Sequence, residues 1–251
     1  MQSGNPALNK RTFLDVADGA VVAHGADAMT VNGTVNKTGF LLVLVLLGAM
    51  YSWARYAGPD SVPALMPLVL GGAIGGLILA LITAFKKAWS PFTAPLYALV
   101  EGLFIGALSA IFEAHYPGIV MRAVGLTFGT MAAMLIAYRS GMIKVTEKFK
   151  LGVVAATGGI LLLYLAQFVM GFLGHSMGFI SGNSTIAIGF SVVVVIIAAL
   201  NLVLDFDLIE TGAHSGAPKY MEWYGAFALV VTLVWLYLEI LRLMSKLQSR
   251  N

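Results

Sequence analysis

The 251-residue sequence contains no cysteine and few charged residues. Without cysteine the chain can form no disulfide, no thiolate metal site and no cysteine nucleophile. Only 11% of its residues are charged, against about 25% in an ordinary soluble domain, and 59% are hydrophobic. A soluble domain of this length cannot bury so much apolar surface or cover it with charge. The composition therefore excludes a soluble enzyme, a nucleic-acid-binding protein and a disordered chain, and it indicates a protein embedded in a lipid bilayer.

The apolar part of the chain divides into seven segments that are each long enough to cross a membrane. A hydrocarbon core of about 30 Å takes about 20 helical residues. The uncharged stretch 151–204 is too long for one span, and breaks near Gly174 and Gly182 divide it into two helices. Transmembrane strands are shorter and alternate in polarity, so we predict an all-α membrane protein. The expected spans are 39–57, 63–85, 91–113, 117–139, 150–173, 184–209 and 221–244.

These spans predict a polar N-terminal arm at 1–38, a transmembrane domain at 39–245 and a short basic tail at 246–251. The arm lacks the apolar core of a signal peptide, and we interpret it as a disordered tail or as a short amphipathic stretch near Phe13 and Val16.

The distribution of basic residues predicts the orientation in the membrane. Most bases fall in the arm and in the loops after the second, fourth and sixth spans: Lys10, Arg11, Lys37, Lys86, Lys87, Arg139, Lys144, Lys148, Lys150 and Lys219. This excess predicts a cytoplasmic N-terminus. Six spans with a re-entrant last segment would keep the basic C-terminal residues on the same side, but the uncharged stretch 223–238 favours a seventh complete span.

Several spans carry glycines four residues apart, a spacing that lets helix backbones approach closely in lipid. The pairs are Gly71/Gly75, Gly72/Gly76, Gly102/Gly106 and Gly125/Gly129. We interpret them as sites of tight helix packing within a bundle.

The informative residues are acids inside the expected spans, and we single out Glu101, Asp205, Asp207 and Glu239. A charge at bilayer depth costs several kcal/mol, so such a group must be neutralised, be paired or face a water-filled cavity. A cluster of carboxyl groups inside a bundle therefore forms a proton-sensitive cation site. Deprotonated carboxylates can coordinate a hard cation such as Ca²⁺, and a protonated pair can close through a carboxyl–carboxylate hydrogen bond.

Each acid also has a simpler structural interpretation. Glu101 can hydrogen-bond serine or threonine hydroxyls in the bundle. Asp205 and Asp207 point about 200° apart on a helix, so only one of them can face a given cavity. Glu239 can form a local ion pair with Arg242, three residues later.

The sequence contains no recognisable hydrolytic site. All four histidines fall in expected arms or loops, and no His-Glu-x-x-His motif is present. We therefore expect no enzymatic activity and no resident cofactor.

Three motifs and the glycine-rich, seven-span layout together resemble the transmembrane Bax inhibitor motif family, in a bacterial branch. The motifs are Ala-Leu-Val-Glu-Gly-Leu-Phe-Ile-Gly at 98–106, Leu-Asp-Phe-Asp-Leu-Ile at 204–209 and Leu-Tyr-Leu-Glu-Ile-Leu at 236–241. The resemblance covers roughly residues 39–245. It implies a seven-helix bundle with the last helix near its centre, a bacterial cytoplasmic membrane, and a pH-sensitive calcium leak.

The resemblance also implies roles for particular residues. It aligns Asp205 and Glu239 with the family's acidic pair, as pH sensor and Ca²⁺ ligands, and Glu101 would line the ion pathway. The family carries an arginine for this pair on its second span, where this sequence has no base. Arg122 or Arg55 could take that part, although Arg122 lies near a span end and can simply extend to the interface.

The spacing of the acidic pair leaves two arrangements open. If the turn between the last two spans centres on 213–217, Tyr224 lies level with Asp205, and Glu239 lies about 20 Å further along the helix. In that case Glu222 becomes a rival partner for Asp205 or Asp207. Alternatively, both helices extend beyond the membrane before they turn, which brings Asp205 and Glu239 together.

We thus expect a protein that lets Ca²⁺ pass down its gradient, with H⁺ as gating ion or counter-ion. The alternative is a non-transporting membrane protein that regulates a protease or another membrane complex. The two differ in their predictions, since the regulator would show no ion flux when purified and would copurify with a protein partner.

Overall fold

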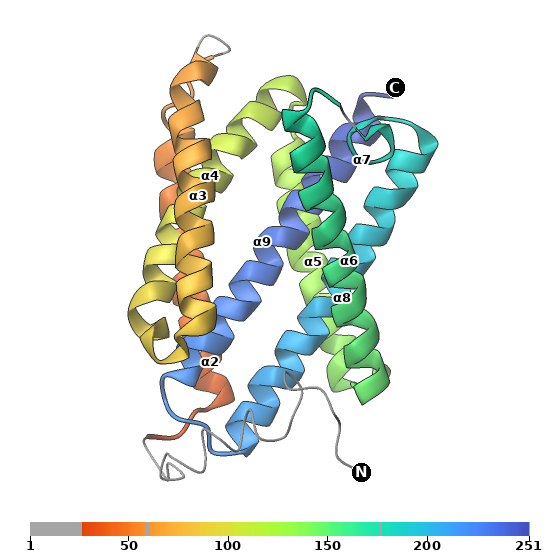
Figure 1. Cartoon of the computed structure of the whole chain (residues 1–251). Coiled ribbons are helices and arrows are strands. Elements are labelled where there is room, and N and C mark those ends of the chain that lie inside the picture. Colours follow the sequence, from red (N-terminus) through yellow and green to blue (C-terminus); the bar gives the residue numbers. More distant parts are fainter. Residues whose placement is uncertain (1–26, 59–60, 176, 251) are drawn as a thin grey trace.

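The structure is a computed structural model that describes residues 27–58, 61–175 and 177–250 (Figure 1). Seven long helices make up most of it, and each is long and apolar enough to cross a membrane. They are α2 (Val31–Trp53), α3 (Val62–Phe85), α4 (Ser90–His115), α5 (Ile119–Arg139), α6 (Glu147–Phe172), α8 (Thr185–His214) and α9 (Met221–Gln248). Two short helices, η3 (Lys87–Trp89) and α7 (Gly178–Ser181), lie between them. The all-α membrane fold predicted from the sequence is therefore confirmed.

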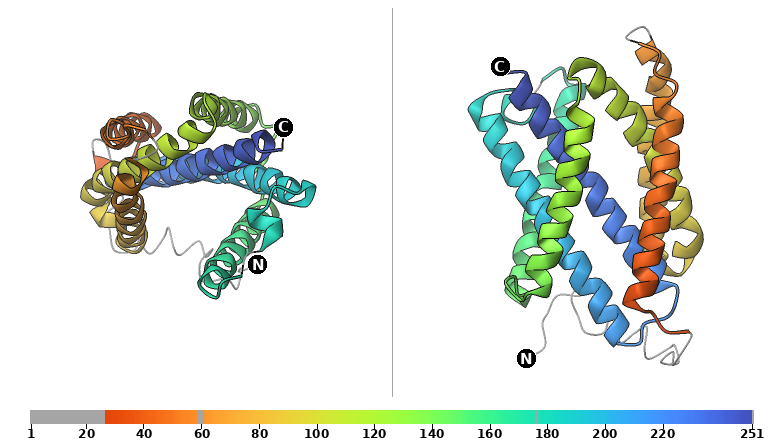
Figure 2. Two further views of the ribbon diagram at one scale, coloured as in Figure 1. Left: turned by 90° about the horizontal axis from the view of Figure 1, so that it is seen from above. Right: turned by 180° about the vertical axis from the view of Figure 1, so that it is seen from behind.

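Helix α9 lies at the centre of the bundle and crosses it from one end to the other (Figure 2). It packs against α2, α4, α5 and α8, and it is the most buried of the seven spans. By contrast, α6 packs mainly on α8 and leaves most of its surface to lipid. The central position of the last helix is confirmed, and its continuous course excludes a re-entrant segment.

The bundle has two ends, which we call lower and upper after Figure 1. Four helices begin at the lower end, namely α2, α4, α6 and α9. Three helices end there, namely α3, α5 and α8, and α9 ends at the upper end. The lower end carries the basic loops, including those after α3 and α5.

The first helix begins at Val31, eight residues before the expected span, so residues 31–38 belong to the bundle rather than to the arm. Thr30 caps this helix, because its hydroxyl accepts a hydrogen bond from the backbone N–H of Gly33. Lys37 lies inside the helix and pairs with Glu222 of α9. The stretch near Phe13 and Val16 lies outside the described residues.

The C-terminal boundary also differs from the expectation. Helix α9 continues to Gln248, and Lys246 is buried against the start of α8 instead of forming part of a basic tail.

The long apolar stretch does divide into two helices, as expected. Helix α6 ends at Phe172, and Gly174 follows with a φ of 77°, a conformation that glycine adopts without strain. Ser184 then caps α8 by accepting a hydrogen bond from the N–H of Ala187.

Two of the glycine pairs lie at tight helix contacts, and the structure shows why. A Cβ on Gly102 or Gly106 would lie 2.3 or 2.2 Å from a backbone oxygen of α2, and one on Gly72 would meet Phe104 at 2.8 Å. Nothing lies within 4 Å of such an atom on Gly125 or Gly129. Close packing of α4 on α2 and on α3 is therefore confirmed, whereas the expectation is wrong for the glycines of α5 and for Gly71, which also has nothing within 4 Å.

Candidate functional site

Asp205 lies about two-thirds of the way along α8, and the Thr232 side chain of α9 lies close to its carboxylate. One carboxylate oxygen, Oδ2, is buried and has no hydrogen-bond partner within the described part of the chain. Buried polar atoms are satisfied in the great majority of cases, so an orphaned carboxylate oxygen in an apolar span marks a site that the fold alone does not explain.

The packing of α8 on α9 fixes how far Asp205 lies from Glu239. Asp205 contacts Thr232, and further up the same antiparallel pair Ser191 accepts a 2.9 Å hydrogen bond from Lys246. Both contacts belong to one register, in which Glu239 lies seven residues above Thr232. Seven helical residues correspond to about 10 Å along the axis.

The acidic pair implied by the family resemblance is thus not formed in this structure. The separation is about half of the 20 Å expected from a turn at 213–217, because α8 continues to His214 and the turn centres near Pro218. Of the two arrangements left open by the sequence, the structure contains the one in which Asp205 and Glu239 are not close, since the helices extend beyond the expected turn but not far enough to bring the two acids together.

Glu239 is held instead by two neighbours. Its side chain is 2% exposed, and it accepts hydrogen bonds from Arg242 (3.0 Å) and from the Tyr164 hydroxyl of α6 (2.9 Å). The Arg242 guanidinium also donates to Tyr164 and lies over its ring. The local ion pair with Arg242, one of the two possibilities left open by the sequence, is the one that the structure contains.

Arg242 is therefore the basic partner that the sequence left unassigned. Arg55 lies at the other side of the bundle, where its guanidinium stacks on Tyr51. Arg122 forms no ion pair with any residue that the structure describes.

Glu101 lies at the middle of α4 and is 8% exposed. Its carboxylate faces Gly76 of α3, where a Cβ atom would approach Oε2 to 2.4 Å. Glycine at this position therefore makes the space that the carboxylate occupies. Within the described ranges Glu101 has no hydrogen-bond or ion-pair partner, so the interpretation as a serine- or threonine-bonded structural acid receives no support.

A cluster of aromatic side chains lies between Glu101 and Asp205. Tyr97 precedes Glu101 by one helical turn and packs edge-on against Phe227 of α9, with ring centroids 5.0 Å apart. Phe227 in turn contacts Tyr224, which lies within electrostatic range of Asp205. The two unpaired acids of the bundle interior are thus connected by side chains that include two phenol hydroxyls.

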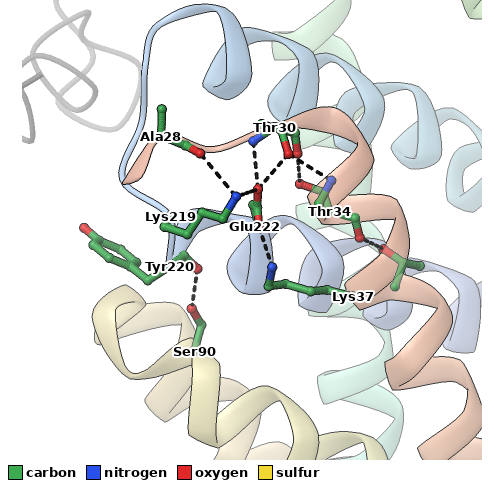
Figure 3. A network of polar contacts seen from close by, with 10 residues as sticks. Ala28, Thr30, Thr34, Lys37, Ser90, Lys219, Tyr220 and Glu222 are labelled. Atoms are coloured by element: carbon green, nitrogen blue, oxygen red, sulfur yellow. Dashed lines mark hydrogen bonds and ion pairs between the residues drawn. The ribbon is translucent and has the colours of Figure 1, made fainter. Parts of the chain in front are cut away.

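Glu222 and Asp207 have partners of their own at the lower end. Glu222 is fully buried, and it accepts hydrogen bonds from the N–H and hydroxyl of Thr30 and pairs with Lys37 and Lys219 (Figure 3). This network fastens the start of α2 to the turn before α9, so Glu222 is not a partner for Asp205. Asp207 pairs with Lys150 at 2.7 Å.

No sequence pattern indicated Tyr164 or Thr232, because a single hydroxyl in an apolar helix is ordinary and its partner depends on helix packing. The described residues contain no group of three or more histidine, cysteine, aspartate or glutamate side chains that could hold a metal ion. The candidate Ca²⁺ ligands Asp205 and Glu239 therefore do not form a preassembled site in this structure.

The family model described as Bax inhibitor 1 like matches residues 5–249. The chain belongs to the Bax inhibitor 1-like family. The match extends over the seven spans and over most of the N-terminal arm, which the motifs alone did not include. Comparison with curated proteins and with solved structures gives no match. Family membership and seven apolar helices together establish an integral membrane protein.

Proposed function

We propose that this membrane protein lets Ca²⁺ leak down its gradient and that protonation of carboxyl groups inside the bundle controls the leak. The observation that carries the proposal is Oδ2 of Asp205, which is buried within a span and has no hydrogen-bond partner in the part of the chain that the structure describes. An acid at this depth costs several kcal/mol, and a protein that needed only packing would hold an apolar side chain there.

The proposed route runs through the interior acids. Ca²⁺ is bound by oxygen ligands, and Asp205 and Glu101 each offer a carboxylate that no base neutralises among the described residues. The aromatic contacts from Tyr97 through Phe227 to Tyr224 link the surroundings of the two acids. A proton on either carboxyl removes the charge that attracts the ion, which makes passage depend on pH.

Glu239 and Arg242 are proposed to act as a latch on this route. Their ion pair, together with Tyr164, joins α9 to α6 in the upper half of the bundle. Protonation of Glu239 removes its attraction for Arg242 and so loosens α6, the helix with the fewest other contacts.

The proposed orientation rests on the distribution of basic residues. The lower end carries Lys86, Lys87, Arg139, Lys144 and Lys150, so we place it, and with it the N-terminus, in the cytoplasm. The proposed setting is the cytoplasmic membrane of a bacterium. The proposal involves no enzymatic reaction and no resident cofactor, with Ca²⁺ and H⁺ as the ions that move or bind.

Flux of Ca²⁺ into dye-loaded proteoliposomes, measured across a pH series, tests the proposal. The wild-type flux is expected to change with pH, and Asp205→Asn is expected to abolish this change. Asp207→Asn is the matched control, because it removes an acid of the same helix that is paired with Lys150 at the surface.

Two outcomes would overturn it. A wild-type flux equal to that of protein-free vesicles would favour a non-transporting regulator, which should then copurify with a protein partner. An unchanged pH profile in both Asp205→Asn and Glu239→Gln would reject these residues as the sensor.

A further inference from the structure

A large groove lies at the lower end of the bundle, away from the interior acids. It encloses about 960 Å³ between the first half of α2, the last half of α5 and the end of α8, with Leu229 of α9 at its floor. This volume is at the upper end of the range of ligand pockets, roughly 300–1,000 Å³. None of Asp205, Glu101 and Glu239 lines it, although Phe206, the chain neighbour of Asp205, does.

The walls of the groove are apolar and face the hydrocarbon region. They include Val35 and Leu42 of α2, Met131 and Leu135 of α5, and Phe206 of α8. Val35 and Leu135 are 60% and 39% exposed although they lie within spans. Helices α2 and α5 are not among the helix pairs with substantial contact, and Figure 2 shows α9 passing behind the space between them. The groove therefore opens sideways toward lipid.

The mouth of the groove, at the membrane boundary, carries free positive charge. Of its acids, Asp207 is neutralised by Lys150, whereas Glu210 accepts a hydrogen bond from the Tyr138 hydroxyl and keeps its single negative charge. The exposed bases Arg139 and Lys144 line the same mouth and have no acidic partner in the part of the chain that the structure describes. His214 also lines it, with Nδ1 hydrogen-bonded to the backbone oxygen of Glu210.

We propose that this groove binds an anionic phospholipid, with an acyl chain between α2 and α5 and the phosphate at Arg139 and Lys144. An apolar channel that opens to the bilayer accepts a hydrocarbon chain, and two unpaired cations at its boundary end select a negatively charged headgroup. A zwitterionic lipid would bring its own cation to the same bases and lose this advantage. The proposal does not depend on ion conduction.

The absence of cysteine allows a direct test. A bimane label on a Leu135→Cys variant would report from the groove wall, because no other residue would be labelled. The protein would be placed in phosphatidylcholine vesicles that contain a small fraction of brominated phosphatidylglycerol or of brominated phosphatidylcholine. Each base near a membrane surface contributes about fivefold to affinity, so the anionic lipid is expected to quench at a roughly 25-fold lower fraction.

Substitution of the two bases identifies the headgroup site. Arg139→Gln with Lys144→Gln should abolish the preference for phosphatidylglycerol. Lys86→Gln with Lys87→Gln is the matched control, since these bases lie at the same end of the bundle but outside the groove, and it should leave the preference unchanged. Mass spectrometry of lipids retained through purification gives a second measurement that does not involve the label.

Three outcomes would overturn the proposal. Equal quenching by both brominated lipids would show that ordinary bilayer lipid fills the groove. Relief of quenching by soluble glycerol phosphate would show a site for a free anion. A lipid preference that appears only after deletion of residues 1–26 would show that this segment occupies the groove in the full chain.

Discussion

The contact between α2 and α4 gives the sharpest prediction about stability. In Gly106→Ala the new Cβ would lie 2.2 Å from the backbone oxygen of Ala49 and 2.6 Å from the Ser52 hydroxyl. Even a close carbon–oxygen contact is about 3.3–3.6 Å, so α2 would have to move away by about 1 Å. Overpacking of this kind lowers the free energy of unfolding by about 1–3 kcal/mol. The backbone of α2 cannot move aside as easily as the end of a flexible side chain could.

The helix propensity of alanine offsets part of this cost, by about 1 kcal/mol. Because backbone atoms oppose the new methyl group, we take the upper end of the overpacking cost, about 3 kcal/mol, and expect Gly106→Ala to lower the free energy of unfolding by about 2 kcal/mol. The matched control is Gly129→Ala on α5, where nothing lies within 4 Å of the added atom, and alanine should raise stability by up to about 1 kcal/mol. The two variants should then differ by about 3 kcal/mol.

Thermal unfolding in detergent, followed by tryptophan fluorescence, measures this difference. For a chain of this size about 3 kcal/mol corresponds to roughly 6–12 °C in Tm. If Gly106→Ala and Gly129→Ala unfold at the same temperature, the close backbone contact between α2 and α4 is not present, and the reasoning fails.

Two further predictions concern the polar contacts of α9. Glu222→Gln should lower the free energy of unfolding by about 2 kcal/mol. This is less than the roughly 3–5 kcal/mol for a fully buried ion pair, because Lys37 and Lys219 reach water. Amide hydrogen exchange at the start of α2 should become faster, and unchanged exchange there would contradict the prediction. Lys246→Met should cost about 1–3 kcal/mol, because it leaves the backbone oxygens of Ile180 and Ala187 without their donor. Amide hydrogen exchange in α7 should become faster in this variant. If the amides of α7 exchange as slowly as in the wild type, Lys246 does not stabilise the position of α7.

Hydropathy and charge were sufficient to predict the seven helices, because lipid forces every spanning segment to be long, apolar and helical. The start of α2 escaped this reasoning. Lys37 ends the uncharged stretch, and nothing nearby in the sequence indicates that Glu222, 185 residues later, neutralises it inside the bundle. Helix boundaries set by a distant ion pair cannot be read from a local pattern.

The same limit applies to the site. The scarcity of charge identified Asp205, Glu101 and Glu239 as the residues to examine, and the i,i+3 spacing to Arg242 was visible. Their relative positions depend on where the turn between α8 and α9 falls. If the centre of this turn shifts by about four residues, the residue of α9 that lies opposite Asp205 changes by about eight positions. The sequence therefore predicted the members of the site but not which of them meet.

Helix α9 holds the bundle together through polar contacts directed at different helices. Glu222 binds α2, Lys246 binds α8, and Glu239 binds Tyr164 of α6. Such contacts carry unusual weight in a bilayer, because lipid tails provide no hydrophobic force that drives helices together. Among the contacts of α9, the one at Asp205 is incomplete, since one carboxylate oxygen stays unpaired. Separation of α8 from α9 is therefore expected to begin at Asp205, where the fewest interactions must be broken and where a proton or a cation would supply the missing partner.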